Sequence, residues 1–207
     1  MHVQEAYDLW SASYDADHNL TRDLDRIKTA ACLGQMRCRA VLEIGCGTGK
    51  NTPLLAQIAE SVTAVDFSAG MIAQAQDKVQ AKNVIFKKAD ITQPWPVAAG
   101  SHNLITCNLI LEHVADLAFI FAQAKRALTP GGQLYVSELH PFRQYRGSVA
   151  RFQQGETTTH IPAFVHHISD FLQAAKENEL SLLALNEYWH EQDKGKLPRL
   201  LTLLFVK

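Results

Sequence analysis

Three glycines at alternate positions follow a short apolar run, and this spacing is the first sign of chemistry in the sequence. The apolar residues 41–44 lead into Gly45, Gly47 and Gly49. Because glycine has no Cβ, the backbone of such a turn can adopt positive φ and approach a flat or polar ligand closely. The segment therefore predicts a strand, a tight turn that binds a nucleotide-like ligand, and the start of a helix. The alternative is a strand-to-helix turn that has no ligand.

The residues after the third glycine separate the ligands that such turns bind. The dinucleotide-binding fingerprint needs its third glycine three residues after its second, and Lys50 stands there instead. The phosphate loop needs Ser or Thr after its lysine, and Asn51 follows Lys50. The spacing therefore argues against a nicotinamide-dependent oxidoreductase and against a phosphate-loop nucleotide site.

Acidic side chains follow the next two predicted strands. Asp66 ends the strand predicted over 61–66, and a carboxylate there can accept two hydrogen bonds from a ribose diol. Asp90 lies just past the strand predicted over 83–88. Ligands of open α/β sheets bind beyond the carboxyl ends of the strands, where the strand order reverses. The alternatives are that Asp66 favours the dipole of the next helix and that Asp90 is an exposed loop residue.

The stretch Glu43-Ile44-Gly45-Cys46-Gly47-Thr48-Gly49 resembles the first motif of the class I S-adenosylmethionine-dependent methyltransferases. The resemblance implies S-adenosylmethionine as the cofactor, with Glu43 organising the loop near the methionine end. It implies that Asp66 binds the ribose, and that Asp90 and the backbone amide of Ile91 lie against the adenine. The full set of cofactor-binding residues that it implies is Tyr14, Glu43, Gly45, Cys46, Gly47, Gly49, Asp66, Phe67, Met71, Asp90, Ile91, Asn108 and Leu109.

Residues 107–114 are similar to the stretch after the fourth strand in methyltransferases of the ubiquinone/menaquinone-biosynthesis type. This resemblance implies that Asn108 lines the methionine or methyl side of the site. The Asn/Asp-Pro-Pro-Tyr/Phe motif is missing, which argues against adenine-N6, cytosine-N4 and glutamine methylation. Glu112 and His113 are adjacent and point apart at a helix start, so capping and surface roles are as good an interpretation as catalysis.

The N-terminal aromatic residues resemble the Tyr-Asp segment in which a ring closes over the cofactor of these enzymes. Tyr14 is the preferred candidate, because aromatic faces attract a cation such as a sulfonium. The alternative is an aromatic staple in which Trp10 and Tyr14 hold a terminal helix on the core.

Helical and strand patterns alternate regularly from residue 39 to residue 139, and such alternation predicts a parallel sheet with helices on both faces. Asp23 and Asp25 come early in the helix predicted over 21–36, which suits the helix dipole. Ser68 and Ser169 are the predicted N-caps of two later helices. The predicted elements are helices over 21–36, 52–59, 68–79, 117–128 and 170–178, and strands over 41–44, 61–66, 83–88, 102–107, 133–139, 180–189 and 200–206. With the resemblance, they imply a three-layer α-β-α Rossmann-like methyltransferase fold whose mostly parallel seven-stranded sheet has the order 3-2-1-4-5-7-6, with the seventh strand antiparallel.

Residues 1–207 are expected to form one methyltransferase domain, with 1–38 as an N-terminal helical cover and 140–167 as a substrate-lid insert. The insert is polar and turn-rich, and its Arg and His content favours an acidic or phenolic substrate. If the acceptor must lose a proton, His140 is the first candidate base and His160 or His166 the second. No metal site is expected, because His160, His166 and His167 lack a carboxylate or cysteine at ligand spacing.

The composition of the chain indicates which binding partners and which cellular compartment to expect. A formal net charge of -1 gives no field to attract a phosphate backbone, so a small-molecule substrate is predicted and nucleic acid is not. The cysteines show no Cys-x-x-Cys pair, and neither a membrane span nor a signal leader is apparent, which predicts a cytoplasmic protein without membrane association. It is expected to be a monomer or a homodimer.

The main functional hypothesis is S-adenosylmethionine-dependent methyl transfer to an O, N or C atom of a small molecule by in-line displacement. The alternative is a non-catalytic S-adenosylmethionine-binding regulatory or partner protein on the same fold, because a fold and a cofactor site do not establish catalysis.

Overall fold

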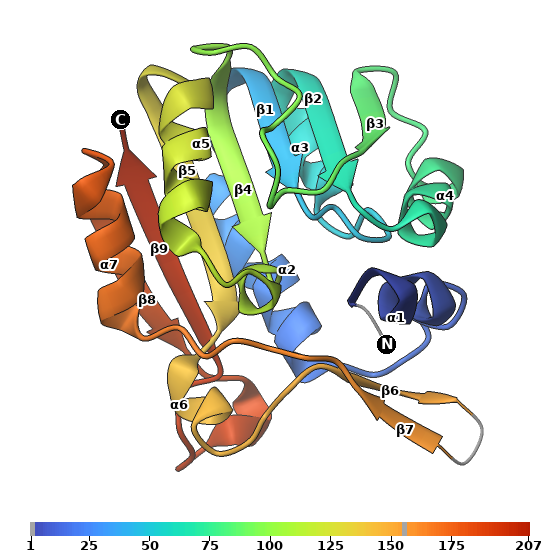
Figure 1. The fold of residues 1–207 in the computed structure, drawn as a ribbon. Helices are drawn as coiled ribbons and strands as arrows, with labels where there is room; N and C mark the ends of the chain where they lie inside the picture. The colour runs from blue at the N-terminus through green and yellow to red at the C-terminus, as the bar shows by residue number, and fades with distance from the viewer. Residues whose placement is uncertain (1–2, 155–156) are drawn as a thin grey trace.

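A seven-stranded sheet with helices on both faces forms the body of the molecule, and the computed structural model describes residues 3–154 and 157–207 (Figure 1). Its strands are β1 (Cys38–Ile44), β2 (Ala59–Asp66), β3 (Val84–Lys88), β4 (His102–Asn108), β5 (Leu128–Leu139), β8 (Ser181–Tyr188) and β9 (Leu200–Val206). The helices are α1 (Val3–Trp10), α2 (Leu20–Leu33), α3 (Thr52–Ile58), α4 (Ala69–Lys78), α5 (Leu117–Ala127), α6 (Pro141–Gln144) and α7 (Ile168–Glu177), with short 3-10 helices η1 (Leu111–His113) and η2 (Glu191–Asp193).

The order of the strands in the sheet is β3-β2-β1-β4-β5-β9-β8. The strands from β3 across to β5 are parallel to their neighbours, and β9 is antiparallel to both β5 and β8. Since β8 and β9 are the sixth and seventh strands of this sheet along the chain, the predicted order 3-2-1-4-5-7-6 with an antiparallel seventh strand is confirmed. The chain order reverses between β1 and β4, so a ligand site is expected beyond their carboxyl ends.

Successive residues of the central strands pack against opposite helical layers. In β1, Leu42 belongs to the larger core cluster together with Phe121 of α5. The preceding residue, Val41, belongs to a second cluster together with Leu33 of α2 and Leu55 of α3. This alternation buries both sides of the strand, which is why its sequence is a nearly continuous apolar run.

The starts of the helices are set by local caps, and one predicted cap is wrong. Ser68 accepts a hydrogen bond from the amide of Met71 and caps α4 as predicted. Helix α7 begins one residue before the predicted cap Ser169, because the Asp170 carboxylate accepts a hydrogen bond at 2.8 Å from the amide of His167, the actual N-cap. Within the two described ranges, no helix combines the length and the apolar character needed to cross a lipid bilayer.

The segment 140–167, which we predicted to lack regular structure, contains α6 and a two-stranded hairpin of β6 (Arg151–Gln154) and β7 (Thr157–His160). The hairpin is antiparallel, with Arg151 opposite His160. Its strands are rich in Gln and Thr and lack alternating apolar residues, so the period-2 signal that identifies a strand in sequence is absent. In Figure 1 the hairpin projects below the sheet, beside the N-terminal helix.

A substitution at the contact between α5 and β9 tests the packing of the larger core cluster. The rings of Phe121 and Phe205 meet edge to face with their centroids 5.4 Å apart, and both side chains are fully buried. We expect Phe205→Ala to lower the free energy of unfolding by about 3–5 kcal/mol, through lost transfer energy and the cavity that remains. Urea denaturation measures this change. The control is Leu183→Ala on the edge strand β8, where the side chain is 53% exposed; equal losses in the two variants would contradict the packing.

Candidate functional site

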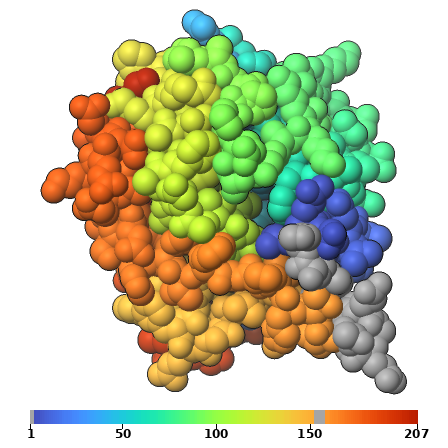
Figure 2. All heavy atoms as spheres, viewed as in Figure 1, coloured from blue at the N-terminus to red at the C-terminus, as the bar shows by residue number. Residues whose placement is uncertain are grey.

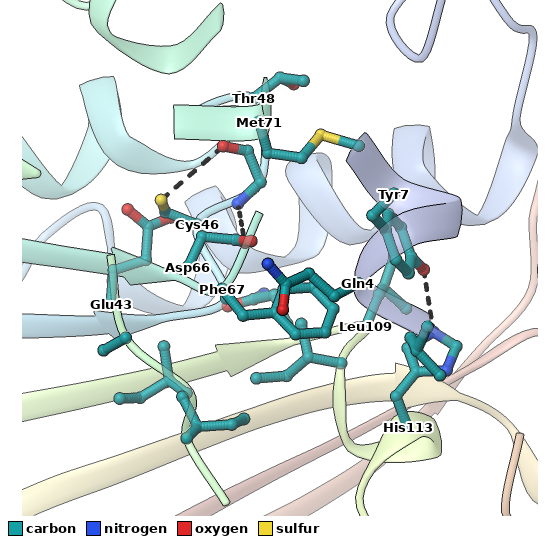
Figure 3. A pocket seen from close by; sticks show the side chains of 18 of the residues that line it. Gln4, Tyr7, Glu43, Cys46, Thr48, Asp66, Phe67, Met71, Leu109 and His113 are labelled. Atoms are coloured by element: carbon teal, nitrogen blue, oxygen red, sulfur yellow. Dashed lines mark hydrogen bonds between the residues drawn. The ribbon is translucent and has the colours of Figure 1, made fainter. Parts of the chain in front are cut away.

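A cavity of about 410 Å³ lies beyond the carboxyl ends of β1, β2, β3 and β4. Figure 3 shows Glu43 and Asp66 toward one side of it and Tyr7 with His113 toward the other. Its lining residues are Val3, Gln4, Tyr7, Tyr14, Glu43, Ile44, Gly45, Cys46, Gly47, Thr48, Lys50, Asn51, Asp66, Phe67, Met71, Ala89, Asp90, Ile91, Thr92, Asn108, Leu109, Ile110, His113 and Val114. The structure thus brings together all the cofactor-binding residues predicted from sequence except Gly49, which packs against Ala75 of α4.

The turn after β1 depends on glycine for two separate reasons. Gly45 and Gly47 have φ values of +68° and +54°, in the region that favours glycine. A Cβ on Gly45 would lie 2.3 Å from Cγ2 of Ile110, whereas a Cβ on Gly47 would meet nothing within 4 Å. Gly45 therefore lets Ile110 pack closely, and Gly47 leaves open space at the cavity wall.

Asp66 joins the glycine turn to the start of α4. Its carboxylate accepts hydrogen bonds from the amide of Gly47 at 2.9 Å and from the amide of Ser68 at 2.9 Å. Burial raises the pKa of this carboxyl to about 6, although the amide hydrogen bonds oppose the shift. Each oxygen retains a further lone pair, so the carboxylate can still accept hydrogen bonds from a diol.

Glu43 is buried within β1, at the base of the glycine turn. Its carboxyl oxygen lies 2.6 Å from the hydroxyl of Thr52, which donates to it at the start of α3. Burial raises the pKa of Glu43 to about 8. Glu43 therefore anchors the turn to α3 and remains largely protonated at neutral pH.

The residues predicted to meet an adenine lie at the exposed rim of the cavity. The Asp90 carboxylate accepts hydrogen bonds from the amide of Thr92 at 2.9 Å and from its hydroxyl at 2.7 Å. The carbonyl of Ile91 accepts a hydrogen bond from the indole of Trp95 at 3.0 Å. This short turn fixes a carboxylate and an amide side by side at the end of β3.

The buried carboxylate of Asp25 holds one wall of the cavity. From the sequence, this residue was expected only to favour the helix dipole. Asp25 lies within α2, beyond its first turn, and is completely buried. It contacts Lys50 at 2.6 Å, Asn51 at 3.1 Å and Asn108 at 2.7 Å, all of which line the cavity. Local sequence carried no signal for this role, because the three partners come from distant positions in the chain.

The N-terminal aromatic residues cover the cavity from the side of α1. Tyr7 stacks on Trp10 and tilts against Phe67, and the ring centroids of Trp10 and Tyr14 are 4.7 Å apart. The guanidinium of Arg22 lies 4.0 Å from the centroid of the Tyr14 ring and occupies one of its faces. The aromatic cluster therefore packs against Ile161 of the insert, and its members Tyr7 and Tyr14 also line the cavity.

One chain of hydrogen bonds connects three segments that border the cavity. The ring Nδ1 of His113 lies 3.0 Å from the carbonyl of Pro162, so Nδ1 must carry the hydrogen. Nε2 of His113 is then an acceptor and receives the hydroxyl hydrogen of Tyr7 at 2.8 Å. Helix α1, η1 and the segment after β7 thus meet at His113, and Figure 2 shows the N-terminal segment beside the insert on one face.

None of the histidines considered as bases is among the residues that line the described cavity. His140 is buried, with Nε2 at 2.7 Å from Glu187 and Nδ1 accepting the amide of Phe142. His160 is exposed on the hairpin, and His166 contacts the carbonyls of Leu111 and Val114. Both ring nitrogens of His140 are therefore engaged in structural contacts.

The basic side chains of the insert are not among the residues that line the described cavity. The guanidinium of Arg143 lies 2.8 Å from Asp193 and donates to the carbonyls of Leu197 and Pro198. Lys50 is the only Lys or Arg among the residues that line the described cavity, and it pairs with Asp25. Within residues 3–154 and 157–207, no group of three or more His, Cys, Asp or Glu side chains is arranged to hold a metal ion.

Comparison with known proteins identifies a methyltransferase domain in this sequence. The profile of the family described as a methyltransferase domain matches residues 42–136, which run from the glycine turn to β5. A relative from Emericella nidulans named an uncharacterized methyltransferase is 25% identical, and the alignment covers 88% of this chain and 77% of the relative. A ubiquinone biosynthesis O-methyltransferase from Xanthomonas oryzae is 28% identical over 66% of this chain, which spans only 57% of that relative.

Solved structures share the fold. An N-methyltransferase from Bradyrhizobium japonicum, solved in complex with S-adenosyl-L-homocysteine, superposes with a TM-score of 0.75. The superposition covers 100% of this chain and 99% of that protein at 18% sequence identity. At this identity the match shows the common fold.

The two glycines of the turn make a matched pair for mutagenesis. Positive φ alone costs an alanine roughly 1–2 kcal/mol, so Gly47→Ala is expected to lower the free energy of unfolding by about that much. Gly45→Ala adds the 2.3 Å contact with Ile110 and is expected to cost distinctly more. Thermal unfolding of the two variants measures the difference. A Gly47→Ala variant that is less stable than Gly45→Ala would contradict the packing described for the turn.

Proposed function

We propose that this chain, whose residues 42–136 match the methyltransferase-domain family, transfers the methyl group of S-adenosylmethionine to a small-molecule acceptor. The observation that carries the proposal is the arrangement of the cavity at the strand ends. The glycine turn after β1, the carboxylate at the end of β2 and the carboxylate after β3 border it along one sheet edge. They match, in that order, the amino-acid, ribose and adenine parts of S-adenosylmethionine.

The donor and acceptor chemistry of the wall fits this cofactor. Asp66 supplies acceptors for the two ribose hydroxyls, and Gly47 leaves open space beside it. The Oδ1 atoms of Asn51 and Asn108 are buried and have no hydrogen-bond partner in the described part of the chain. Such orphaned acceptors are costly unless a ligand supplies donors, and the α-ammonium of the cofactor has three.

When bound, the cofactor supplies an electrophilic methyl group on a positively charged sulfur. The protein contributes position and shelter for an in-line displacement, for which no protein nucleophile is required. The aromatic faces of Tyr7 and Tyr14 and the carboxylate of Asp66 border the space and suit a cation. Helix α1 forms one side of the cavity through Val3, Gln4 and Tyr7.

We propose that the acceptor enters between α1 and the insert 140–167, and that this insert acts as the substrate lid. Residues 1–38 form the helical cover, and the whole chain is one domain. Ile161 of the insert is buried against Ala6 and Trp10, so the two segments already touch. A small-molecule acceptor fits the near-neutral charge of the chain and the relative named for ubiquinone biosynthesis. We also propose a cytoplasmic monomer or homodimer that does not act on nucleic acid.

Two titrations and one assay test the proposed function. Isothermal titration is expected to give saturable binding of S-adenosylhomocysteine and none of NAD; binding of NAD alone would contradict the cofactor assignment. A screen of phenols, amines and carbon acids with labelled S-adenosylmethionine then tests transfer. Binding of the cofactor without label transfer to any acceptor would favour the non-catalytic alternative.

The pH dependence of binding tests the role of Asp66. The ribose diol binds best to the ionised carboxylate, so the affinity for S-adenosylhomocysteine is expected to fall as the pH drops through about 6. The contribution of Asp66 to the stability of the fold changes with pH in the opposite direction to the binding affinity. Because its pKa is raised in the folded state, this contribution is present at low pH and is lost as the pH rises through about 6. Asp66→Asn should weaken binding by roughly 100-fold at pH 8 and flatten this part of the profile. An unchanged affinity and profile would remove Asp66 from the ribose site.

His140 is expected to stabilise the fold without taking part in the transfer step. Its ring bridges Glu187 of β8 and the first turn of α6, so His140→Ala should lower the free energy of unfolding by about 1–3 kcal/mol. Turnover per folded molecule should stay within about twofold of the wild type at a temperature where both proteins are folded. A loss of turnover greater than tenfold, with unchanged cofactor affinity, would restore His140 as the base.

A further inference from the structure

A cluster of polar residues centred on Asp25 lies beside the cavity and includes three of its lining residues. The Asp25 carboxylate accepts five hydrogen bonds although its side chain is completely buried. Oδ1 accepts from Asn108, Ser137 and Thr29 at 2.7, 2.6 and 3.2 Å. Oδ2 accepts from Lys50 at 2.6 Å and from Asn51 at 3.1 Å. The donors come from the glycine turn, β4, β5 and α2 itself.

The carboxylate keeps its charge in this setting. Burial raises the pKa of Asp25, but the Lys50 ammonium and the hydrogen bonds outweigh burial and hold the pKa below its usual value. An ionised carboxylate has no hydrogen to donate. Both amides that touch it must therefore turn their nitrogen toward it.

This requirement decides where the amide oxygens point. With Nδ2 of Asn51 and of Asn108 committed to Asp25, each Oδ1 faces away from the carboxylate. These two oxygens are buried and without partners in the described part of the chain, and both residues line the cavity. Two amide oxygens of cavity-lining residues are thus left to accept hydrogen bonds.

We propose that Asp25 is a positioning residue that fixes Asn51 and Asn108 as paired acceptors for the α-ammonium group of the cofactor. The inference rests on the proposed function. It concerns the α-ammonium group, which is present at the amino-acid end of the cofactor and absent from its adenosine end. Asp25 does not touch the ligand itself. It acts by excluding the flipped amide rotamers, in which an NH2 group would face the ammonium and repel it.

Replacing the carboxylate by its amide isostere removes this constraint. In Asp25→Asn, one of the two carboxylate oxygens is replaced by an NH2 group, which donates hydrogen bonds. This group faces Lys50 and Asn51 in one rotamer of the new amide and Asn108 in the other. An ammonium cannot accept a hydrogen bond, so the neighbouring Asn51 or Asn108 must flip or lose its partner. Either change removes an acceptor from the cavity while the volume of the side chain stays the same.

The experiment compares two ligands that differ only at the amino-acid end. S-adenosylhomocysteine carries the α-amino group, whereas 5′-methylthioadenosine carries the adenosine and thioether alone. Isothermal titration of the full chain should give an Asp25→Asn variant that binds S-adenosylhomocysteine at least tenfold more weakly. Its affinity for 5′-methylthioadenosine should stay within about twofold of the wild type. Asn51→Ala should show the same selectivity, and Asn51 makes no capping bond at α3 that its removal would break.

The matched control removes a different buried carboxylate. Asp193 pairs with Arg143 and Arg199 outside the residues that line the cavity. Asp193→Asn is expected to lower thermal stability and leave both affinities unchanged.

Each outcome decides between the claims. A selective loss for S-adenosylhomocysteine in Asp25→Asn supports the inference. An equal loss for both ligands, or no loss, overturns it and leaves Asp25 a purely structural residue. If Asp25→Asn does not fold, a nonselective Asn51→Ala variant overturns the inference and a selective one supports it. If the wild-type protein binds neither ligand, the proposed function itself is contradicted. This failure is distinguished from failure of the inference about Asp25, because it is seen without any variant.

Discussion

One buried carboxylate, that of Asp25, ties together more elements around the cavity than any other described side chain. It joins α2 to the glycine turn, to β4 and to β5 through hydrogen bonds of 2.6–3.2 Å. Removing a charge from water is costly, and only a complete set of donors with a nearby cation offsets that cost. The chain meets this condition with Lys50 and four neutral donors, and the geometry of the cavity wall follows from it.

Carboxyl groups also bind loop amides at the ends of β2 and β5, where burial raises their pKa. Asp66 accepts two backbone amides and joins the glycine turn to α4, and Glu138 accepts the amides of Ile110 and Leu111 before η1. Each carboxylate replaces water at loop amides that would otherwise be buried without partners. The strand-end loops are therefore held by side chains of the sheet, and the cavity is formed before any ligand arrives.

The sequence predicted those features that depend on local spacing. The strand order follows from regular alternation, and Gly45, Asp66 and Asn108 were identified because strand ends converge at one edge of a parallel sheet. Asp25 was assigned to the helix dipole, because nothing within α2 reveals which way a polar residue faces a sheet made later in the chain. His140 was chosen by its position after β5, and the structure commits both its ring nitrogens elsewhere, to Glu187 and a backbone amide.

The central claim is that this cavity is arranged for the three parts of an adenosyl amino acid. A crystal structure of the protein with S-adenosylhomocysteine tests it most directly. The account predicts ribose hydroxyls within about 3.2 Å of the Asp66 carboxylate, and the α-amino nitrogen at the same range from Oδ1 of Asn51 and Asn108. A ligand bound elsewhere, or bound in this cavity with its amino group away from both asparagines, would contradict the account.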